Sequence, residues 1–65
     1  MYETILDHRI LSLRETAEWA GISLATLRRL IQRGEGPLVT RLSERCVGVR
    51  AVHLAAWLDE RTDGA

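Results

Sequence analysis

The sequence contains one cysteine and no lysine among its 65 residues. A lone cysteine, Cys46, cannot form an internal disulfide, so the fold has no covalent cross-link and suits a reducing compartment. A chain of this length has room for one domain, and its small core gives marginal stability. No apolar run approaches about 18 residues, and no positively charged segment precedes one. We therefore expect a cytoplasmic protein with neither a membrane span nor a signal peptide.

Further absences limit the chemistry. There is no glycine-rich phosphate loop, and His8 and His53 lie far apart with no cysteine or carboxylate at ligand spacing. Cys46 has no assignable histidine partner, which favours a small hydrophobe over a nucleophile. The carboxylates of residues 59–63 fall in a polar tail, where a solvated helix end is the simpler interpretation. We expect no catalytic residue, no metal and no cofactor, and we do not expect an enzyme.

The formal net charge of zero conceals a polarised distribution. Residues 24–50 hold six arginines against two glutamates, a net charge of +4, whereas residues 1–23 and residues 51–65 each carry −2. A basic middle between acidic ends is compatible with a nucleic-acid partner despite overall neutrality. Every strong cation is arginine, whose planar fork suits phosphate and guanine edges. A GC-rich genome would produce the same bias toward arginine.

A first helix is predicted from Ser12 onward. Ser12 and Glu15 have the spacing of a capping box, in which each side chain accepts the other residue's amide. The apolar face that follows consists of Leu13, Ala17 and Ala20, with Thr16 and Trp19 at its edges. Gly21 is placed to end this helix in a left-handed conformation.

A second helix is predicted almost immediately afterwards. Ser23 is its N-cap, the helix runs to about Arg33, and Gly34 ends it. Its apolar stripe consists of Leu27, Leu30 and Ile31. Two short helices separated by a glycine-containing turn are typical of a helix-turn-helix.

The remaining chain predicts a hairpin and a third helix. Residues 35–37, Glu-Gly-Pro, end the helical pattern, and residues 38–42 and 47–49 then form two short strands joined by residues 43–46, a "wing". Leu11 is a candidate for a further short strand beside the wing. Helical spacing returns from about Ala51, with apolar residues Leu54, Trp57 and Leu58.

These elements define a mostly α fold with a small β-hairpin, a winged helix-turn-helix. The domain spans residues 11–61, residues 1–10 receive no assignment, and residues 62–65 form a polar tail. Trp19 and Trp57 have indole rings of the kind that stack on bases. In so small a protein, however, each tryptophan is more commonly a core or interface anchor.

The exposed face of the second helix carries the candidate DNA contacts. If its apolar stripe faces inward, a turn of about 100° per residue directs Ala25, Arg29, Gln32 and Arg33 outward, with Thr26 and Arg28 on the flanks. Outward side chains suit base edges in a major groove, and Thr26 and Arg28 suit phosphates. The complete candidate set is Ser23, Ala25, Thr26, Arg28, Arg29, Gln32 and Arg33 on the helix, and Arg41, Ser43 and Arg45 on the wing. A solvated basic face is the alternative for any single arginine.

The ordered segments GISLATLRRLIQRGEGP, LSERCVGVR and AAWL make the chain similar to the small excisionase and AlpA-type regulators, relatives of the MerR winged-helix domain. The resemblance covers residues 11–61. It implies a winged helix-turn-helix that binds short, repeated sites in double-stranded phage or mobile-element DNA. Members either bend DNA to direct an integrase toward excision or regulate transcription. The effector domain and coiled coil of MerR proteins are missing from this chain, so no small-molecule effector is implied.

Three positions depart from the family pattern. Leu24 stands where a polar or basic residue is usual, so it either packs against the domain or makes an exposed apolar contact. Residues 51–53, Ala-Val-His, replace the usual polar start of the last helix and predict a weak cap. Glu44 places a negative charge on the wing, which disfavours phosphate contact there.

Three functions are compatible with these features. The first is an excisionase, or recombination directionality factor, whose copies bind side by side and associate head to tail through acidic ends and basic middles. The second is a transcriptional regulator of a mobile element, which uses the same surface. The third is a protein-interaction adaptor built on the same scaffold, because a fold does not fix a function.

Overall fold

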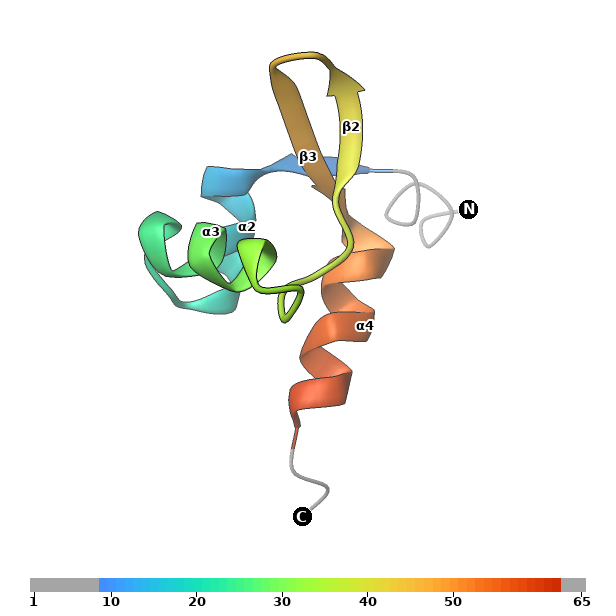
Figure 1. Ribbon diagram of the computed structural model, residues 1–65. Helices are drawn as coiled ribbons and strands as arrows, with labels where there is room; N and C mark the ends of the chain where they lie inside the picture. Colours follow the sequence, from blue (N-terminus) through green and yellow to red (C-terminus); the bar gives the residue numbers. More distant parts are fainter. Residues whose placement is uncertain (1–8, 63–65) are drawn as a thin grey trace.

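The computed structural model describes residues 9–62, and the order of elements matches the predicted winged helix-turn-helix. The elements are β1 (Ile10–Ser12), α2 (Leu13–Ala20), α3 (Leu24–Gln32), β2 (Thr40–Ser43), β3 (Cys46–Arg50) and α4 (Ala51–Arg61). Helices predominate, and a small antiparallel sheet carries the hairpin (Figure 1).

The capping signals of the two helix starts are confirmed. The Ser12 hydroxyl accepts the Glu15 amide at 3.0 Å, and the Glu15 carboxylate accepts the Ser12 amide at 3.0 Å. Ser23 accepts the Thr26 amide at the start of α3. Gly21 and Gly34 follow the helices with φ values of 75° and 76°, the left-handed conformation that side chains with a Cβ disfavour. The helix-turn-helix is thus specified by local chemistry.

The sheet has the strand order β1-β3-β2, with both pairings antiparallel. The strand predicted around Leu11 is confirmed, since Leu11 pairs with Val49. Ile10 belongs to this strand as well, and the Ala51 amide donates to the Arg9 carbonyl at 2.9 Å. Gly48 sits in the central strand, where an added Cβ would lie 2.8 Å from the Leu11 carbonyl oxygen. A bare backbone at this position lets β1 approach β3.

The predicted wing forms, but its strand boundaries were wrong by one to two residues. The first strand begins at Thr40 rather than at residue 38, and the turn is Glu44-Arg45 rather than residues 43–46. A register shift between Arg41 and Ser43 brings Ser43 opposite Cys46, which lengthens both strands toward the tip. Leu38 lies before the strand and is exposed, whereas its neighbour Pro37 is buried.

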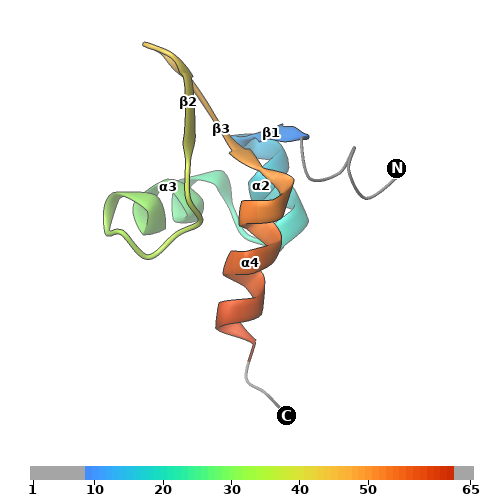
Figure 2. The ribbon, with the colours of Figure 1, turned by 90° about the vertical axis from the view of Figure 1, so that its right-hand side faces the viewer.

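The core lies where β1, β3 and α4 meet the helix-turn-helix. Its buried cluster is Leu11, Val49, Leu54 and Trp57, with Leu13, Ala20, Ile22 and Leu30 packed against it. Leu27 of α3 has no exposed surface. The hairpin projects beyond this core, and α4 extends in the opposite direction (Figures 1 and 2).

Two side-chain placements differ from the predicted apolar faces. Thr16, expected at the edge of its helix, is fully buried, because its hydroxyl donates to the Ser12 carbonyl at 2.8 Å and leaves only the methyl to be packed. Leu58 was expected in the stripe of the last helix but is 37% exposed, since α4 turns Leu54 and Trp57 inward instead. The expected weak start of this helix is confirmed, as Arg50 makes no side-chain cap.

Candidate nucleic-acid interface

The first turn of α3 is arranged to accept an anion. The Ser23 hydroxyl accepts the Thr26 amide at 3.1 Å and donates its only proton to the Thr26 hydroxyl at 2.8 Å. The Thr26 hydroxyl keeps its own proton for an outside acceptor. The first turn of α3 contains no acidic residue, whereas the first turn of α2 contains Glu15. The positive end of the α3 dipole is therefore available to a phosphate.

The outward face of α3 is basic and exposed, as its predicted orientation requires. Leu27 is fully buried, and Leu30 and Ile31 are half-buried, so the apolar stripe faces the core. The residues that face away are all exposed: Ala25, Arg28, Arg29, Gln32 and Arg33. Thr26 is half-buried beside the cap. This face has the length and side chains to enter a groove of duplex DNA.

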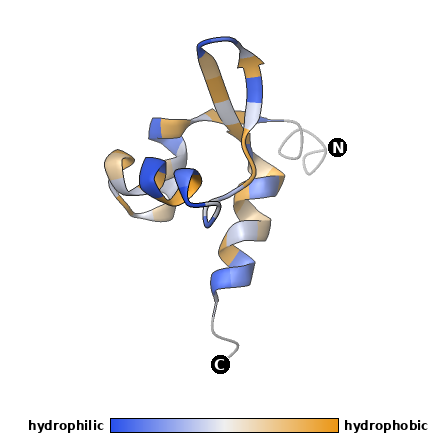
Figure 3. Ribbon diagram, in the orientation of Figure 1, coloured by the Kyte–Doolittle hydropathy of each residue, from blue (hydrophilic) through white to orange (hydrophobic). Residues whose placement is uncertain are grey.

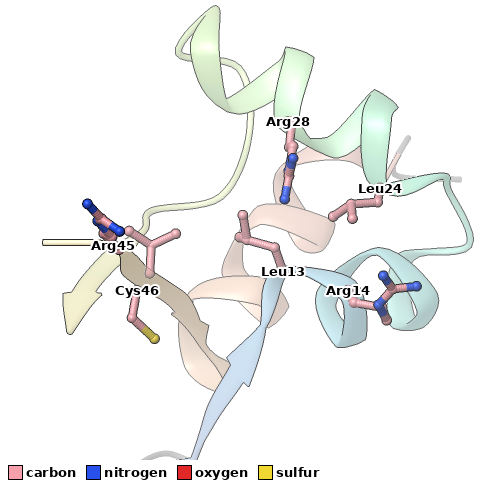
Figure 4. A pocket seen from close by; sticks show the side chains of 7 residues that line it. Leu13, Arg14, Leu24, Arg28, Arg45 and Cys46 are labelled. Atoms are coloured by element: carbon pink, nitrogen blue, oxygen red, sulfur yellow. The ribbon is translucent and has the colours of Figure 1, made fainter. Parts of the chain in front are cut away.

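A cavity of about 260 Å³ separates α3 from the hairpin, and we call it the basic cavity. It is lined by Leu13, Arg14, Leu24, Arg28, Arg45, Cys46 and Val47. Figure 4 shows Leu24 and Arg28 directed from α3 into this space. Three arginines from three different elements, α2, α3 and the hairpin turn, are among the residues that line it. Clustered cations with an open approach attract a polyanion.

Arg28 lies on a flank of α3, where the sequence placed it, and this flank faces the hairpin. Thr26 does not line the basic cavity and is bonded to Ser23. The two flanks of α3 are consequently not equivalent, and Arg28 is the side chain that joins the helix surface to the wing.

Arg14 is the residue that the sequence did not single out. It was counted with the acidic N-terminal part of the chain, yet it lines the basic cavity from the first turn of α2. Its neighbour Leu13 faces the core, which places Arg14 on a flank of the helix. Which flank meets α3 depends on how the two helices cross, and that is a non-local property.

The wing contributes Arg41 and Arg45 to the side of the molecule that carries the basic cavity. Arg45 lies in the exposed turn and lines the basic cavity. Arg41 pairs with Val47, so both side chains lie on the cavity-facing side of the hairpin. The Arg41 guanidinium donates to the Glu44 carbonyl at 3.3 Å, which holds it across the turn.

Ser43 and Glu44 are placed less favourably for DNA. Ser43 pairs with Cys46, whose sulfur points away from α3 in Figure 4. Ser43 therefore lies on the opposite side of the hairpin from Arg41, and it does not line the basic cavity. Glu44 is exposed in the turn and places its carboxylate next to Arg45 in sequence. The wing thus presents its cations and its anion within one short hairpin.

Leu24 satisfies both alternatives that the sequence left open. It is half-buried and packs into the basic cavity beside Leu13 and Val47, so part of its side chain belongs to the domain. Its remaining surface faces the same open space as Arg28 (Figure 4). An apolar surface in a cavity that arginines also line suits contact with a sugar or a thymine methyl group.

Hydrophilic residues gather on the elements proposed to face DNA and at one end of α4. Figure 3 shows hydrophilic residues along α3 and at the tip of the hairpin, and again at the end of α4. Within residues 9–62, no three His, Cys, Asp or Glu side chains are grouped so that they could share a metal ion. His8 lies outside the described residues. The described helices are also too short and too polar for any of them to cross a bilayer.

A helix-turn-helix flanked by a basic hairpin, with an exposed arginine-rich second helix, defines the class of winged helix-turn-helix DNA-binding domains. The family model described as "Prophage CP4-57 regulatory protein (AlpA)" matches residues 9–62. The chain belongs to this AlpA family of phage-related regulatory DNA-binding proteins. A search of the curated proteins found no match, and a search of the solved structures found none either.

Proposed function

We propose that this protein is an excisionase, or recombination directionality factor, of a phage or integrative mobile element. It acts by binding DNA and performs no catalysis itself. The observation that carries the proposal is the basic cavity beside the second helix of the helix-turn-helix and the wing, whose lining includes Arg14, Arg28 and Arg45. Its site of action is the DNA of the bacterial cytoplasm.

In the proposed mode of binding, α3 lies in a major groove and the hairpin lies over the adjacent backbone or minor groove. Arg29 and Gln32 face away from the core and are the candidates for base edges. Arg28 and Arg45 line the space between helix and hairpin, and Arg41 pairs with Val47 on the same side of the hairpin; these three are the candidates for phosphates. Two elements bound to neighbouring grooves would favour a bent duplex.

Head-to-tail association along DNA is part of the proposal. Asp59 and Glu60 are exposed near the end of α4, and α4 extends away from the hairpin (Figure 2). An acidic end on one copy and a basic middle on the next form a contact that does not close into a ring. Such a contact would let copies bind repeated sites side by side, and an integrase bound to the same DNA is the proposed partner.

Gel-shift and circular-permutation assays with attachment-site DNA test the proposal. We expect cooperative complexes on the repeated sites and a change of mobility with the position of the site, which reports a bend. An Arg28→Ala/Arg29→Ala double variant is the control, because both side chains are exposed and their loss should leave the fold intact. Strictly non-cooperative binding to unbent DNA would refute the excisionase mechanism.

A transcriptional regulator is the second candidate, and the regulatory description of the AlpA family favours it. It uses the same surface, so binding assays alone do not separate the two. Integrase-driven excision and a promoter reporter should be measured in the same strain with and without the gene. Altered transcript levels with unchanged excision would favour the regulator, and lost excision with unchanged integrase transcription would favour the excisionase.

A further inference from the structure

The carbonyl oxygen of Glu35 is held by two side chains of α4. The Trp57 indole Nε1–H donates to it at 2.8 Å, and Arg61 Nη1 donates to it at 3.2 Å. The Arg61 guanidinium also lies over the Trp57 ring, 5.0 Å from its centre, in a cation–π contact. We call this arrangement the Glu35 clamp. Its residues line a second space with Gly34, Gly36 and Glu60, and it shares no residue with the basic cavity.

The clamp acts on the segment that leaves α3. Glu35 follows α3 closely and is also tied back to it, since its amide donates to the Leu30 carbonyl at 2.8 Å. The next residue, Gly36, lies so close to α3 that an added Cβ would be 2.9 Å from Ile31 Cγ1. Pro37 is then buried. The segment is therefore fastened to the end of α3 on one side and to α4 on the other.

The other end of α4 is joined directly to the wing. β3 ends at Arg50 and α4 begins at Ala51, with no residue between them. Leu54 of α4 and Val49 of β3 belong to the same buried cluster, which makes this junction part of the core. A restraint between Glu35 and α4 is thus a restraint between α3 and the hairpin. In Figure 1 the segment from the end of α3 passes beside α4 before it rises into β2.

We propose that Trp57 and Arg61 are positioning residues for DNA binding, which act by fixing the hairpin relative to α3. The proposal rests on the proposed function, because it assumes that both elements engage one duplex. A binding surface made of two elements loses affinity when their relative position must be ordered on binding. Neither side chain needs to touch DNA for this effect, and Arg61 lies near the far end of α4 (Figures 1 and 2).

The test compares Arg61→Met and Trp57→Phe with wild type in quantitative DNA binding over a series of salt concentrations. Methionine keeps an unbranched chain at an exposed site, and phenylalanine keeps a ring but loses the N–H donor. We expect each variant to bind about three- to tenfold more weakly, the equivalent of one lost hydrogen bond. The log–log salt slope should not change, because no phosphate contact is removed.

Two matched variants show whether a loss of affinity comes from positioning or from a lost phosphate contact. Arg28→Met removes a cation at the basic cavity, so it should lower affinity and also reduce the salt slope by about one. Trp19→Phe makes the same chemical change as Trp57→Phe on a side chain that is 70% exposed, and it should leave affinity unchanged. A reduced slope in Arg61→Met would show that Arg61 contacts phosphate directly and would overturn the positioning role.

Amide hydrogen exchange of the free protein gives a readout that does not depend on DNA. In both clamp variants we expect faster exchange at the Glu35 amide, which bonds to Leu30, while the Leu27 amide of α3 keeps its protection. Wild-type exchange together with wild-type affinity in a folded Arg61→Met variant would refute the clamp. A wild-type protein that binds no duplex would refute the proposed function, and Glu35 exchange would still decide whether the clamp restrains the segment.

Discussion

Arg28 of α3 and Arg45 of the hairpin turn line the same cavity, although they come from elements that are separated in the chain by a loop and a strand. No carboxylate is among the residues that line this cavity. Cations around an open space without a compensating carboxylate attract an anion. The pair is therefore suited to contact with a phosphate backbone.

The first prediction concerns the helix side of this pair. Replacing Arg28 and Arg29 by alanine should abolish retention on DNA, because both cations lie on the exposed side of α3. A protein with about four phosphate contacts should show a salt slope near −3 to −4, and each lost contact should reduce it by about one. Filter or gel-shift binding over a salt series measures this.

The control for this experiment is Arg9→Ala. Arg9 is an exposed arginine whose guanidinium lies 3.7 Å from Glu15, at the start of β1 rather than on α3. It should leave the salt slope unchanged, because Arg9 lies on neither α3 nor the wing. The fold should also be kept, because the Arg9 carbonyl still accepts from the Ala51 amide. Equal losses in both proteins would mean that net charge, and not the α3 surface, controls binding. Unchanged retention of the double variant would refute the placement of α3 in the groove.

The second prediction concerns the anion of the wing. Glu44→Gln should raise affinity by about two- to fivefold at low salt, because an exposed carboxylate beside the DNA backbone repels it. The carbonyl that holds Arg41 is unaffected by this change. On a duplex that carries a single site, where head-to-tail association plays no part, Glu60→Gln removes the same charge from α4 and should have little effect. The gain at Glu44 should fade as salt is raised, which distinguishes it from a new contact.

The helix-turn-helix was predictable from the sequence because its determinants are local. Ser12 and Glu15 lie three residues apart, and Gly21 and Ser23 are separated by a single residue, so each cap depends on near neighbours. The inward orientation of Leu27 follows from spacing alone. Once Leu27 is placed inward, the helical spacing alone predicts which residues of α3 face outward.

The other half of the site depends on contacts between distant residues. Arg14 joins the basic cavity because α2 packs against α3, and the sequence does not specify which flank of α2 lies there. The face on which Ser43 lies is set by an irregular register next to Arg41, which no turn motif in the sequence specifies. The bond between Trp57 and the Glu35 carbonyl joins residues on separate elements and has no sequence signal. Its effect is nevertheless to place the predicted elements relative to each other.

The third prediction is a pH dependence from the capping box. The Ser12 amide and hydroxyl donate to the Glu15 carboxylate and, with Arg9 nearby, hold the pKa of Glu15 below its ordinary value of 4.5. A folded-state pKa below the unfolded value means that the unfolded chain takes up the proton first as pH falls. This contribution to stability is complete above the unfolded pKa and is lost as pH falls from about 4.5 through the folded value.

Glu15→Gln isolates that contribution, since glutamine keeps a side-chain acceptor for the Ser12 amide but does not titrate. Urea unfolding of both proteins should be compared at neutral pH and at several points below pH 5. The difference in unfolding free energy between wild type and variant should shrink as pH falls. A constant difference across this range would contradict the assignment.

The fourth prediction tests the approach of β1 to β3. In Gly48→Ala, the new Cβ would lie 2.6 Å from Ile10 Cγ2 and 2.8 Å from the Leu11 carbonyl oxygen, distances at which something must move. The carbonyl belongs to a paired strand and cannot move without loss of the ladder. We expect a destabilisation of about 1–3 kcal/mol. In a domain of this size, each kcal/mol corresponds to about 4–8 °C in Tm.

A double-mutant cycle with Ile10→Ala separates the two contacts that the new Cβ would make. Ile10 is 39% exposed, so its truncation alone should cost little. If the clash with Cγ2 contributes, Gly48→Ala should be less costly in the Ile10→Ala background, with a coupling that thermal unfolding resolves. The residual cost then belongs to the Leu11 carbonyl. Additive effects would assign the whole penalty to the backbone contact, and a tolerated Gly48→Ala in the native background would show that β1 does not need this close approach.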